Sequence, residues 1–266
     1  MPDPARANRA YRNVARVVRP PMLAMTRRDW RGAENYPTDR GFIAAANHMT
    51  NIDPITFAHY LYDHGIAPRI LAKSSLFTVP VLGKILTATG QIPVHRNTSD
   101  AGRSLDAAVA ALEAGECVAV FPEGTLTRQP DLWPMAGKTG VARLALTTRA
   151  PVIPAAQWGP QDLLGHYEKL LKPFPPKRVT IVAGPPVDLD DLYDRPLDNA
   201  TLREATERVM AAITVLLEEI RGEKAPAERF DMRRAKAADN GASVDPTQPP
   251  SSGTAPGAAP GGEPAP

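Results

Sequence analysis

The sequence predicts a single α/β domain in which a mainly parallel sheet is flanked by helices. Short apolar runs alternate with longer segments of helical periodicity along most of the chain, and this alternation is typical of a parallel sheet. With 266 residues, the chain can hold one domain of roughly 200 residues with a full core. Both ends differ in composition, so we divide the chain into an N-terminal segment (1–31), a central domain (32–221) and a tail (222–266).

The first strand of the central domain is predicted at 41–46, where Gly-Phe-Ile-Ala-Ala-Ala forms an apolar run. A helix follows, because an aspartate such as Asp53 can cap a helix and Pro54 is tolerated in its first turn. The complete predicted order is strand 41–46, helix 54–64, extended segment 69–73, short helix 80–88, strand 91–95, helix 100–114, strand 116–121, helix 138–148, strand 152–157, strand 178–183 and helix 199–221.

The N-terminal segment is strongly basic. It contains eight arginines against Asp3 and Asp29, which gives eight minus two, or a net charge of +6. Wound as a helix at about 100° per residue, 7–19 separates its arginines from an apolar side, and Pro20-Pro21 is predicted to end this helix. The apolar side consists of Ala7, Ala10, Tyr11, Val14 and Val18. Such a basic amphipathic helix can lie on an anionic bilayer or pack on the protein's own core, and the sequence leaves both interpretations open.

The C-terminal tail lacks the apolar residues that a core needs. Residues 241–266 contain seven prolines and five glycines, and Val244 is their only large aliphatic residue. A segment of this composition cannot bury enough apolar surface to offset its ordering entropy. We therefore predict that the tail is disordered.

Other features bear on the compartment. No run of about 18 apolar residues exists and no signal peptide is recognisable, so no transmembrane helix is expected. The single cysteine, Cys117, lies in an apolar run and is predicted to be a buried strand residue rather than a nucleophile. These features favour a cytoplasmic protein.

The strongest chemical signal follows the strand at 41–46. In Asn47-His48-Met49-Thr50-Asn51-Ile52-Asp53, an imidazole precedes a carboxylate by five residues at the seam between a strand and a helix, where α/β proteins usually place their chemistry. Histidine suits general base catalysis because its unperturbed pKa of about 6.5 lies near neutrality. Asp53 would hold the second ring nitrogen and stabilise the imidazolium. A metal-dependent hydrolase that uses both residues as ligands is disfavoured, because metal sites usually need three or four converging ligands.

Three further motifs follow this block in order. A strand-like run ends at Arg96, the motif Phe121-Pro122-Glu123-Gly124-Thr125 precedes Arg128, and 152–156 is an apolar strand that carries a proline. Together with the His-x4-Asp block, they resemble the four sequence blocks of the glycerolipid acyltransferase superfamily, whose best-known members are the 1-acyl-sn-glycerol-3-phosphate acyltransferases. The resemblance covers about 41–159, most of the central domain.

The resemblance implies a site for a phosphate. Arg96 and residues of the Glu-Gly-Thr block would hold it, because the planar fork of arginine matches phosphate oxygens. Glu123 would bond the glycerol or orient Arg96, and Thr125 would donate to a phosphate oxygen. Two interpretations of Gly124 stay open. It is explained as a turn residue with positive φ, and backbone N–H groups around Gly124 and Thr125 are also possible oxyanion donors.

Two cations complete the predicted site. Arg128 follows the third block, and Lys138 lies in a stretch that resembles a lysine-glycine stretch of relatives. Lys138 is equally explained as a solvated lysine ahead of a helix. Two departures from the family pattern concern the acceptor. His95 stands where an acidic residue often precedes the arginine of the second block, and Leu126 stands where a second arginine often follows the threonine.

The implied chemistry is direct transfer of a fatty acyl group from acyl-CoA, or an acyl carrier protein, to the sn-2 hydroxyl of 1-acyl-sn-glycerol 3-phosphate. It gives phosphatidic acid without a covalent acyl-enzyme and without a cofactor. Glycerol 3-phosphate, another lysophospholipid or a glycolipid is an alternative acceptor, and a non-catalytic membrane adaptor is a different class of function. We expect a peripheral protein at the inner face of the cell membrane, with an anionic membrane surface as partner and no nucleic-acid partner.

Overall fold

A computed structural model describes residues 7–95, 101–232 and 234–235. Arg96 and the part of the predicted tail from 236 onward lie outside these residues. The described residues up to Phe230 form one compact unit. The sheet and every element considered below belong to this unit.

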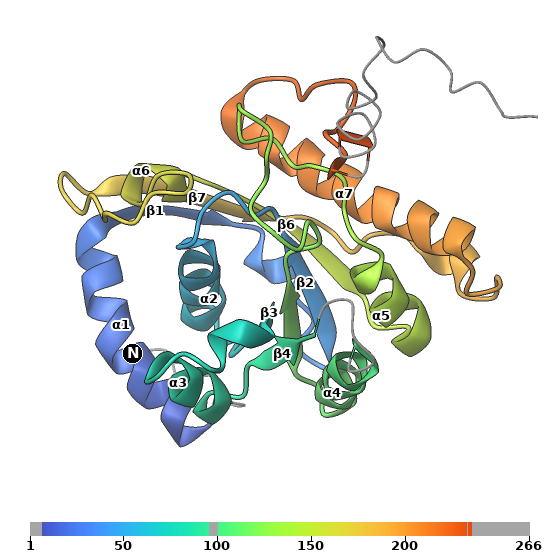
Figure 1. Cartoon of the computed structure of the whole chain (residues 1–266), viewed down its shortest axis with the longest axis horizontal. Helices are drawn as coiled ribbons and strands as arrows, with labels where there is room; N and C mark the ends of the chain where they lie inside the picture. Colours follow the sequence, from blue (N-terminus) through green and yellow to red (C-terminus); the bar gives the residue numbers. More distant parts are fainter. Residues whose placement is uncertain (1–6, 96–100, 233, 236–266) are drawn as a thin grey trace, which may run out of the picture. The chain divides into compact units, whose positions relative to one another are not determined.

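A seven-stranded sheet organises this unit in the order β1-β7-β6-β2-β5-β3-β4 (Figure 1). Neighbouring strands pair in parallel, except that β6 and β7 pair antiparallel. The mainly parallel α/β fold predicted from the sequence is therefore confirmed. The strands are β1 (Thr26–Arg31), β2 (Phe42–Ala46), β3 (Arg69–Lys73), β4 (Ile92–Val94), β5 (Cys117–Val120), β6 (Val152–Trp158) and β7 (Lys177–Ala183).

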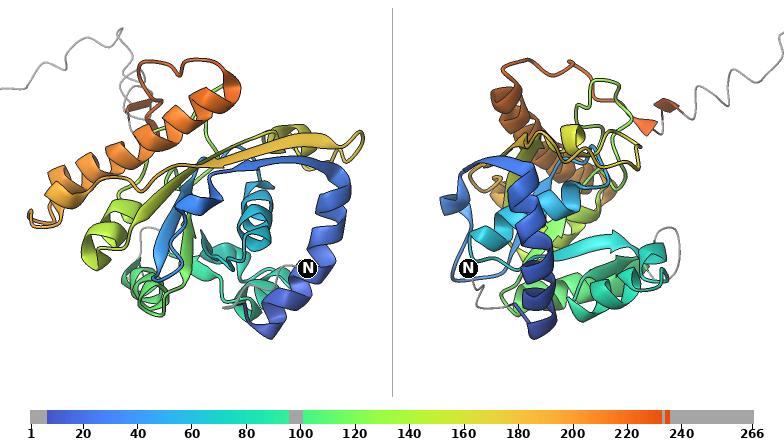
Figure 2. Two further views of the ribbon diagram at one scale, coloured as in Figure 1. Left: turned by 180° about the vertical axis from the view of Figure 1, so that it is seen from behind. Right: turned by 90° about the vertical axis from the view of Figure 1, so that its left-hand side faces the viewer.

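Helices cover both faces of the sheet (Figures 1 and 2). They are α1 (Arg9–Met25), α2 (Asp53–Asp63), α3 (Leu82–Ala88), α4 (Ala101–Glu113), α5 (Gly140–Thr148), α6 (Pro160–Leu163) and α7 (Asn199–Arg221), with short 3-10 turns at Ala33–Asn35, Ser74–Leu76 and Asp190–Leu192. One apolar cluster joins the sheet to α4, α5 and α7, and another joins the opposite face to α2.

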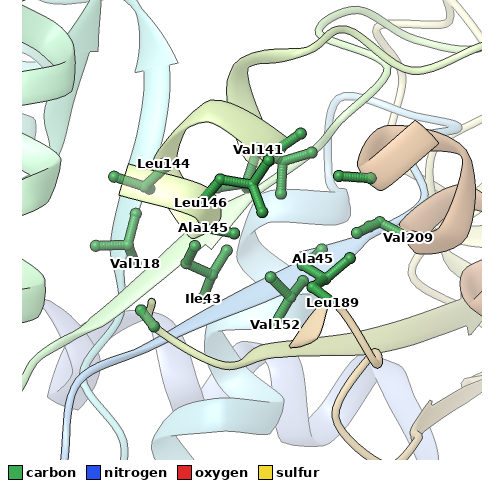
Figure 3. Close-up of a cluster of buried hydrophobic side chains, with 14 of the residues drawn as sticks. Ile43, Ala45, Val118, Val141, Leu144, Ala145, Leu146, Val152, Leu189 and Val209 are labelled. Carbon is green, nitrogen blue, oxygen red and sulfur yellow. The ribbon is translucent and has the colours of Figure 1, made fainter. Parts of the chain in front are cut away.

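The alternation of side chains along β2 explains these two clusters. Ile43 and Ala45 face α5 and α7, together with Val118 and Val152 of the neighbouring strands (Figure 3). Phe42, with the alanines at 44 and 46, faces α2. Successive strand residues point to opposite faces, so a strand that is apolar on every residue must be covered on both sides. This arrangement fixes the carboxyl end of β2 rigidly.

The predicted end of the first helix at Pro20-Pro21 is wrong, because α1 continues to Met25 with both prolines inside it. A proline within a helix removes one hydrogen bond to the carbonyl four residues earlier. Here Pro20, Pro21 and Val17 are exposed, so solvent can reach this side of the helix. Part of the apolar side of α1 packs on the protein itself, since Ala7 and Tyr11 are buried against Tyr62 of α2.

The predicted segment boundaries also need correction. Residues 26–31 are not part of a separate amphipathic segment, because β1 pairs with β7 as an edge strand of the sheet. At the other end, 222–230 belongs to the compact unit. Ala225 packs beside Trp133, and the Phe230 carbonyl accepts the Ala136 N–H at 2.9 Å.

Strand direction determines which chain segments meet at one edge of the sheet. The strands β2, β5, β3, β4 and β6 all run the same way, so their carboxyl ends lie together. Because β7 is antiparallel to β6 and β1 is parallel to β7, the amino ends of β1 and β7 lie at this same edge. In open α/β sheets, this edge is where ligands bind.

Candidate active site

His48 lies just past the carboxyl end of β2, as the sequence predicted. Its Nδ1 is 3.0 Å from Oδ2 of Asp53, and the imidazole stacks on the Phe121 ring with centroids 4.5 Å apart. With Nδ1–H directed at the carboxylate, Nε2 is the ring nitrogen left for a substrate. The His48 side chain is 16% exposed, whereas Asp53 is 0% exposed. The carboxylate of Asp53 is therefore buried, while the His48 ring remains partly accessible to a solute.

Four groups hold the Asp53 carboxylate in place. Besides His48, Oδ2 accepts the backbone N–H groups of Met49 and Thr50, and Oδ1 accepts the Thr50 hydroxyl at 2.7 Å. Hydrogen bonds to an ionised carboxylate are roughly twice as strong as neutral ones. The turn at 49–53 thus wraps around the carboxylate, and every oxygen is already used. A carboxylate held in this way orients an imidazole and leaves little room for a metal ion.

Glu123 contacts the backbone of the protein through both carboxylate oxygens. It is buried, its Oε1 accepts the His48 N–H at 2.7 Å, and its Oε2 accepts the Met135 N–H at 3.1 Å. The predicted contacts of Glu123 with glycerol or with Arg96 stay predictions. Burial raises the pKa of Glu123 to about 8, against the opposing effect of these two hydrogen bonds. Glu123 ties the loop of His48 to the segment that follows β5.

The sequence did not reveal a second buried network beneath His48. The Asn47 side chain exchanges hydrogen bonds with the backbone of Gln157 in β6, at 2.8 and 3.1 Å. The Gln157 amide in turn donates to the Asn47 carbonyl and accepts the Thr56 hydroxyl of α2 at 2.8 Å. All three residues are buried. The network joins β2, β6 and α2, and its only sequence signal is a glutamine within an apolar strand.

Gly124 adopts φ +68°, the left-handed conformation that glycine favours. Lys138 lies over it, because a Cβ built on Gly124 would stand 3.1 Å from Lys138 Nζ. The Lys138 N–H also donates to the Pro122 carbonyl at 2.8 Å. The structure thus brings the ammonium group of Lys138 against the Glu-Gly-Thr turn, and its cationic role in the site stays a prediction.

The amide groups of this turn are not equivalent. The Gly124 N–H donates to the Phe121 carbonyl at 2.9 Å, so it is already used within the turn. The Thr125 N–H has no acceptor among the described residues. Thr127 N–H donates to the His48 carbonyl at 2.8 Å, which places this segment directly beside the loop of His48.

Comparison with known proteins identifies the family. Residues 27–158 match the protein-family model described as Acyltransferase. The chain belongs to this family. The match includes His48, Asp53 and the Glu-Gly-Thr turn.

Curated relatives of this acyltransferase family carry a more specific name. A 1-acyl-sn-glycerol-3-phosphate acyltransferase of Bacillus subtilis is 32% identical over 129 residues, which is 48% of this chain and 61% of the relative. One of Borreliella burgdorferi is 31% identical over 124 residues, 46% of this chain and 48% of the relative. The chain thus spans about half to three fifths of the length of these two relatives.

The acyltransferase fold is also seen in a solved structure. The 1-acyl-sn-glycerophosphate (LPA) acyltransferase PlsC from Thermotoga maritima matches with a TM-score of 0.61 and 23% sequence identity, covering 81% of both chains. At this identity the likeness supports the fold alone.

The other predicted site residues differ in their exposure to solvent. Thr125 is half-buried in the turn, and Arg128 is exposed immediately after Thr127. Arg96 lies outside the described residues. Leu126, at the position where the resemblance leads us to expect a second arginine, is 6% exposed, so this position is an apolar core contact.

Over the described part of the chain, no helix is long and apolar enough to span a bilayer. Over the same part, no three side chains of His, Cys, Asp or Glu come together as a metal site. Cys117 is buried in β5, and burial raises the pKa of its thiol far above the ordinary value.

Proposed function

We propose that the protein transfers a fatty acyl group from acyl-CoA, or an acyl carrier protein, to the sn-2 hydroxyl of 1-acyl-sn-glycerol 3-phosphate, giving phosphatidic acid. The observation that carries the proposal is the His48–Asp53 pair. Nδ1 of His48 lies 3.0 Å from a buried carboxylate while the ring remains partly exposed. This pair lies in the part of the chain that matches the family model.

In the proposed reaction, Nε2 of His48 takes the proton of the acceptor hydroxyl as its oxygen attacks the thioester carbonyl. The tetrahedral intermediate then collapses and breaks the carbon–sulfur bond. The imidazolium returns the proton to the departing thiolate, so the products are an ester and a free thiol. Asp53 stabilises the imidazolium and fixes the ring orientation. No acyl-enzyme forms in this scheme.

Two groups of the third block would stabilise charge. The Thr125 N–H is the backbone donor left for the oxyanion, and such a donor typically contributes about 2.7–4 kcal/mol to lowering a barrier. Lys138, whose ammonium lies against Gly124, would attract the phosphate of the acceptor. Arg96 and Arg128 keep their proposed roles as further phosphate ligands.

Glu123 would act as a positioning residue in this scheme. It holds the His48 N–H on one oxygen and the Met135 N–H on the other. Removing it would free the loop of His48 without removing any group that touches substrate.

We also propose that the protein works at the cytoplasmic face of the cell membrane as a peripheral protein. A lysophospholipid acceptor resides in the bilayer, so the carboxyl edge of the sheet must reach it. A different acceptor, such as glycerol 3-phosphate or a glycolipid, is the second candidate, and the apolar Leu126 is the observation that favours it.

The test is an acyl-transfer assay with purified protein. Labelled acyl-CoA or acyl carrier protein is offered with a panel of lysophospholipids, glycerol 3-phosphate and a glycolipid, and the products are read by mass spectrometry. We expect His48→Ala to lower transfer by roughly 10²–10⁴-fold. The matched control is His64→Ala, because His64 is an exposed histidine whose Nδ1 contacts the Tyr60 carbonyl.

The panel separates the candidates. Phosphatidic acid as main product supports the first acceptor, and another acylated product moves the assignment to the second. Equal activity of His48→Ala and the parent would refute the mechanism. Absence of transfer to any acceptor in the parent would favour a non-catalytic adaptor.

A further inference from the structure

An open pocket of about 500 Å³ lies at the amino ends of β1 and β7. Its walls are Arg27, Arg28, Asp29, Pro176 and Arg178. Three arginines and one aspartate thus line it, with Arg28 directed at Asp63 and the Trp30 ring and not at Asp29. No step of the proposed acyl transfer uses any of these residues.

The carboxylate does not neutralise the pocket. Arg178 donates to Asp29 at 2.7 Å, and Arg28 lies over the Trp30 ring with one nitrogen 3.7 Å from Asp63. The side chain of Arg27 has no hydrogen bond or ion pair among the described residues. The pocket therefore keeps a surplus of positive charge, and its arginine forks are suited to the oxygens of a phosphate.

The loop that leads into this pocket exposes apolar side chains to solvent. Leu170 is 74% exposed and Phe174 is 72% exposed, and Tyr167 and Leu171 on the same loop are also exposed. Pro176, a wall of the pocket, is two residues beyond Phe174. Exposed large apolar groups beside a basic pocket suit a surface that touches acyl chains and head groups together.

The pocket and His48 lie along one edge of the sheet. The amino ends of β7 and β1 lie toward the same edge as the carboxyl end of β2, two and three strands away. They extend further along the strand direction, because Ala46 is level with Ala155 and Ala183, and Lys177 lies six residues beyond Ala183. At about 4.8 Å per spacing, the offset across the sheet is roughly 10–14 Å, and the five residues from Ala183 to Arg178 add an offset of about 17 Å along the strands relative to Ala46. The same loop is anchored to the active site, because Nδ1 of His166 lies 2.6 Å from the Met49 carbonyl.

From this arrangement we propose that the pocket is a second lipid site, which binds the head-group phosphate of an anionic phospholipid in a bilayer. The arginines hold the phosphate while Leu170 and Phe174 insert among the neighbouring acyl chains. A free phosphate, or the nucleotide part of acyl-CoA, would contact the arginines but would leave the four exposed apolar side chains without a binding partner. The site would keep the carboxyl edge, and with it His48, at the membrane surface. Its purpose rests on the proposed function, but its existence is measured independently.

The experiment is co-sedimentation of the full chain with vesicles of phosphatidylcholine, with or without phosphatidylglycerol. The charge variant is Arg27→Gln with Arg178→Gln, and the apolar variant is Leu170→Ser with Phe174→Ser. The matched control is Arg40→Gln with Arg203→Gln, which removes the same charge from exposed arginines elsewhere. Thermal melts confirm that each variant is folded.

We expect the parent and the control to bind the anionic vesicles. The charge variant should bind them about ten- to thirty-fold more weakly, because each basic group near an anionic surface adds roughly a factor of five. The apolar variant should lose binding to both kinds of vesicle. Added salt should weaken the parent more than the charge variant.

Other outcomes overturn the proposal. Parent protein that does not sediment with anionic vesicles, or a charge variant that sediments like the control, excludes a lipid site here. A charge variant with normal sedimentation but slower transfer from acyl carrier protein would assign the pocket to the donor. Parent protein that binds inorganic phosphate but does not bind vesicles would show that the pocket is a simple anion site.

A separate assay tests the proposed function by measuring acyl transfer to a detergent-dispersed lysophospholipid. There the charge variant should match the parent, since no vesicle is involved. Inactivity of the parent in that assay would refute the proposed function and would leave the sedimentation result unchanged.

Discussion

Two loops at the same edge of the sheet are built in opposite ways. In the loop after β2, the Asp53 carboxylate is buried and accepts four hydrogen-bond donors, and His48 is only partly exposed. In the loop between β6 and β7, Leu170 and Phe174 face solvent. The first loop satisfies its polar groups internally, which preorganises chemistry. The second exposes apolar groups that the protein itself does not cover, which suits contact with an outside surface.

The largest expected effect is at Asp53. We expect Asp53→Asn to lower kcat by roughly 10²–10⁴-fold, because an amide can present N–H to Nδ1 and select the wrong tautomer of His48. Steady-state kinetics measures this, with Asp39→Asn as a control at an exposed aspartate. A variant as active as the control would remove the main distinction between the two loops.

Glu123 tests how far the first loop depends on buried partners. We expect Glu123→Ala to destabilise the fold by about 2–4 kcal/mol, because the N–H groups of His48 and Met135 lose their acceptors in a buried place. Denaturant unfolding measures the free energy, and Glu113→Ala at an exposed position is the control. An equal loss in both variants would contradict the positioning role.

The raised pKa of Glu123 makes a separate prediction about pH. Since the folded protein holds the proton up to about pH 8 and the unfolded chain releases it near 4.5, the stability contributed by protonation is lost as pH rises through this window. We expect the parent to lose stability relative to Glu123→Gln between about pH 5 and 8. Parallel stability profiles of the two proteins would show that Glu123 keeps an ordinary pKa.

Gly124 and Gly65 form a matched pair with smaller effects. Both have positive φ, but an added Cβ meets Lys138 only at Gly124, while nothing lies within 4 Å at Gly65. We expect each alanine variant to lose about 1 kcal/mol of stability, and only Gly124→Ala to raise KM for a phosphate-bearing acceptor. A similar KM in both variants would dissociate Lys138 from acceptor binding.

The smallest effect is expected in the second loop. Phe174→Ser should change the free energy of unfolding by less than about 0.5 kcal/mol, because this side chain is 72% exposed. Thermal unfolding provides the measurement, and Phe57→Ser in the buried cluster on α2 is the contrasting variant. A large loss at Phe174 would mean that this loop supports the fold.

The sequence predicted what depends on local spacing. His48 and Asp53 are five residues apart, so a strand followed by a helix suffices to bring them together. The same reasoning did not reveal the hydrogen bond of Glu123 to the His48 backbone, because the two residues are distant in sequence and become neighbours only through the pairing of β2 with β5. The buried contact between Asn47 and Gln157 was missed for the same reason, since it depends on the pairing of β2 with β6.

Local pattern also failed at the edges of the fold. The strand β1 reads Thr-Arg-Arg-Asp-Trp-Arg, which has no apolar alternation because an edge strand needs little burial. The proline pair predicted a helix end, yet α1 continues. The destabilisation by two prolines on an exposed side is smaller than the stabilisation by the packing of α1 against α2 and by the Arg19–Asp63 ion pair.

The pairing of β1 with β7 has a consequence for synthesis. Thr26 pairs with Lys177, so the strand leaves the ribosome roughly 150 residues before its partner, a delay of about 8–30 s at typical elongation rates. During this interval the nascent strand has a free edge that invites association with other chains. Its arginines repel those of neighbouring copies, which opposes association before β7 is made. The same arginine-rich composition is the reason that the sequence pattern did not predict this strand.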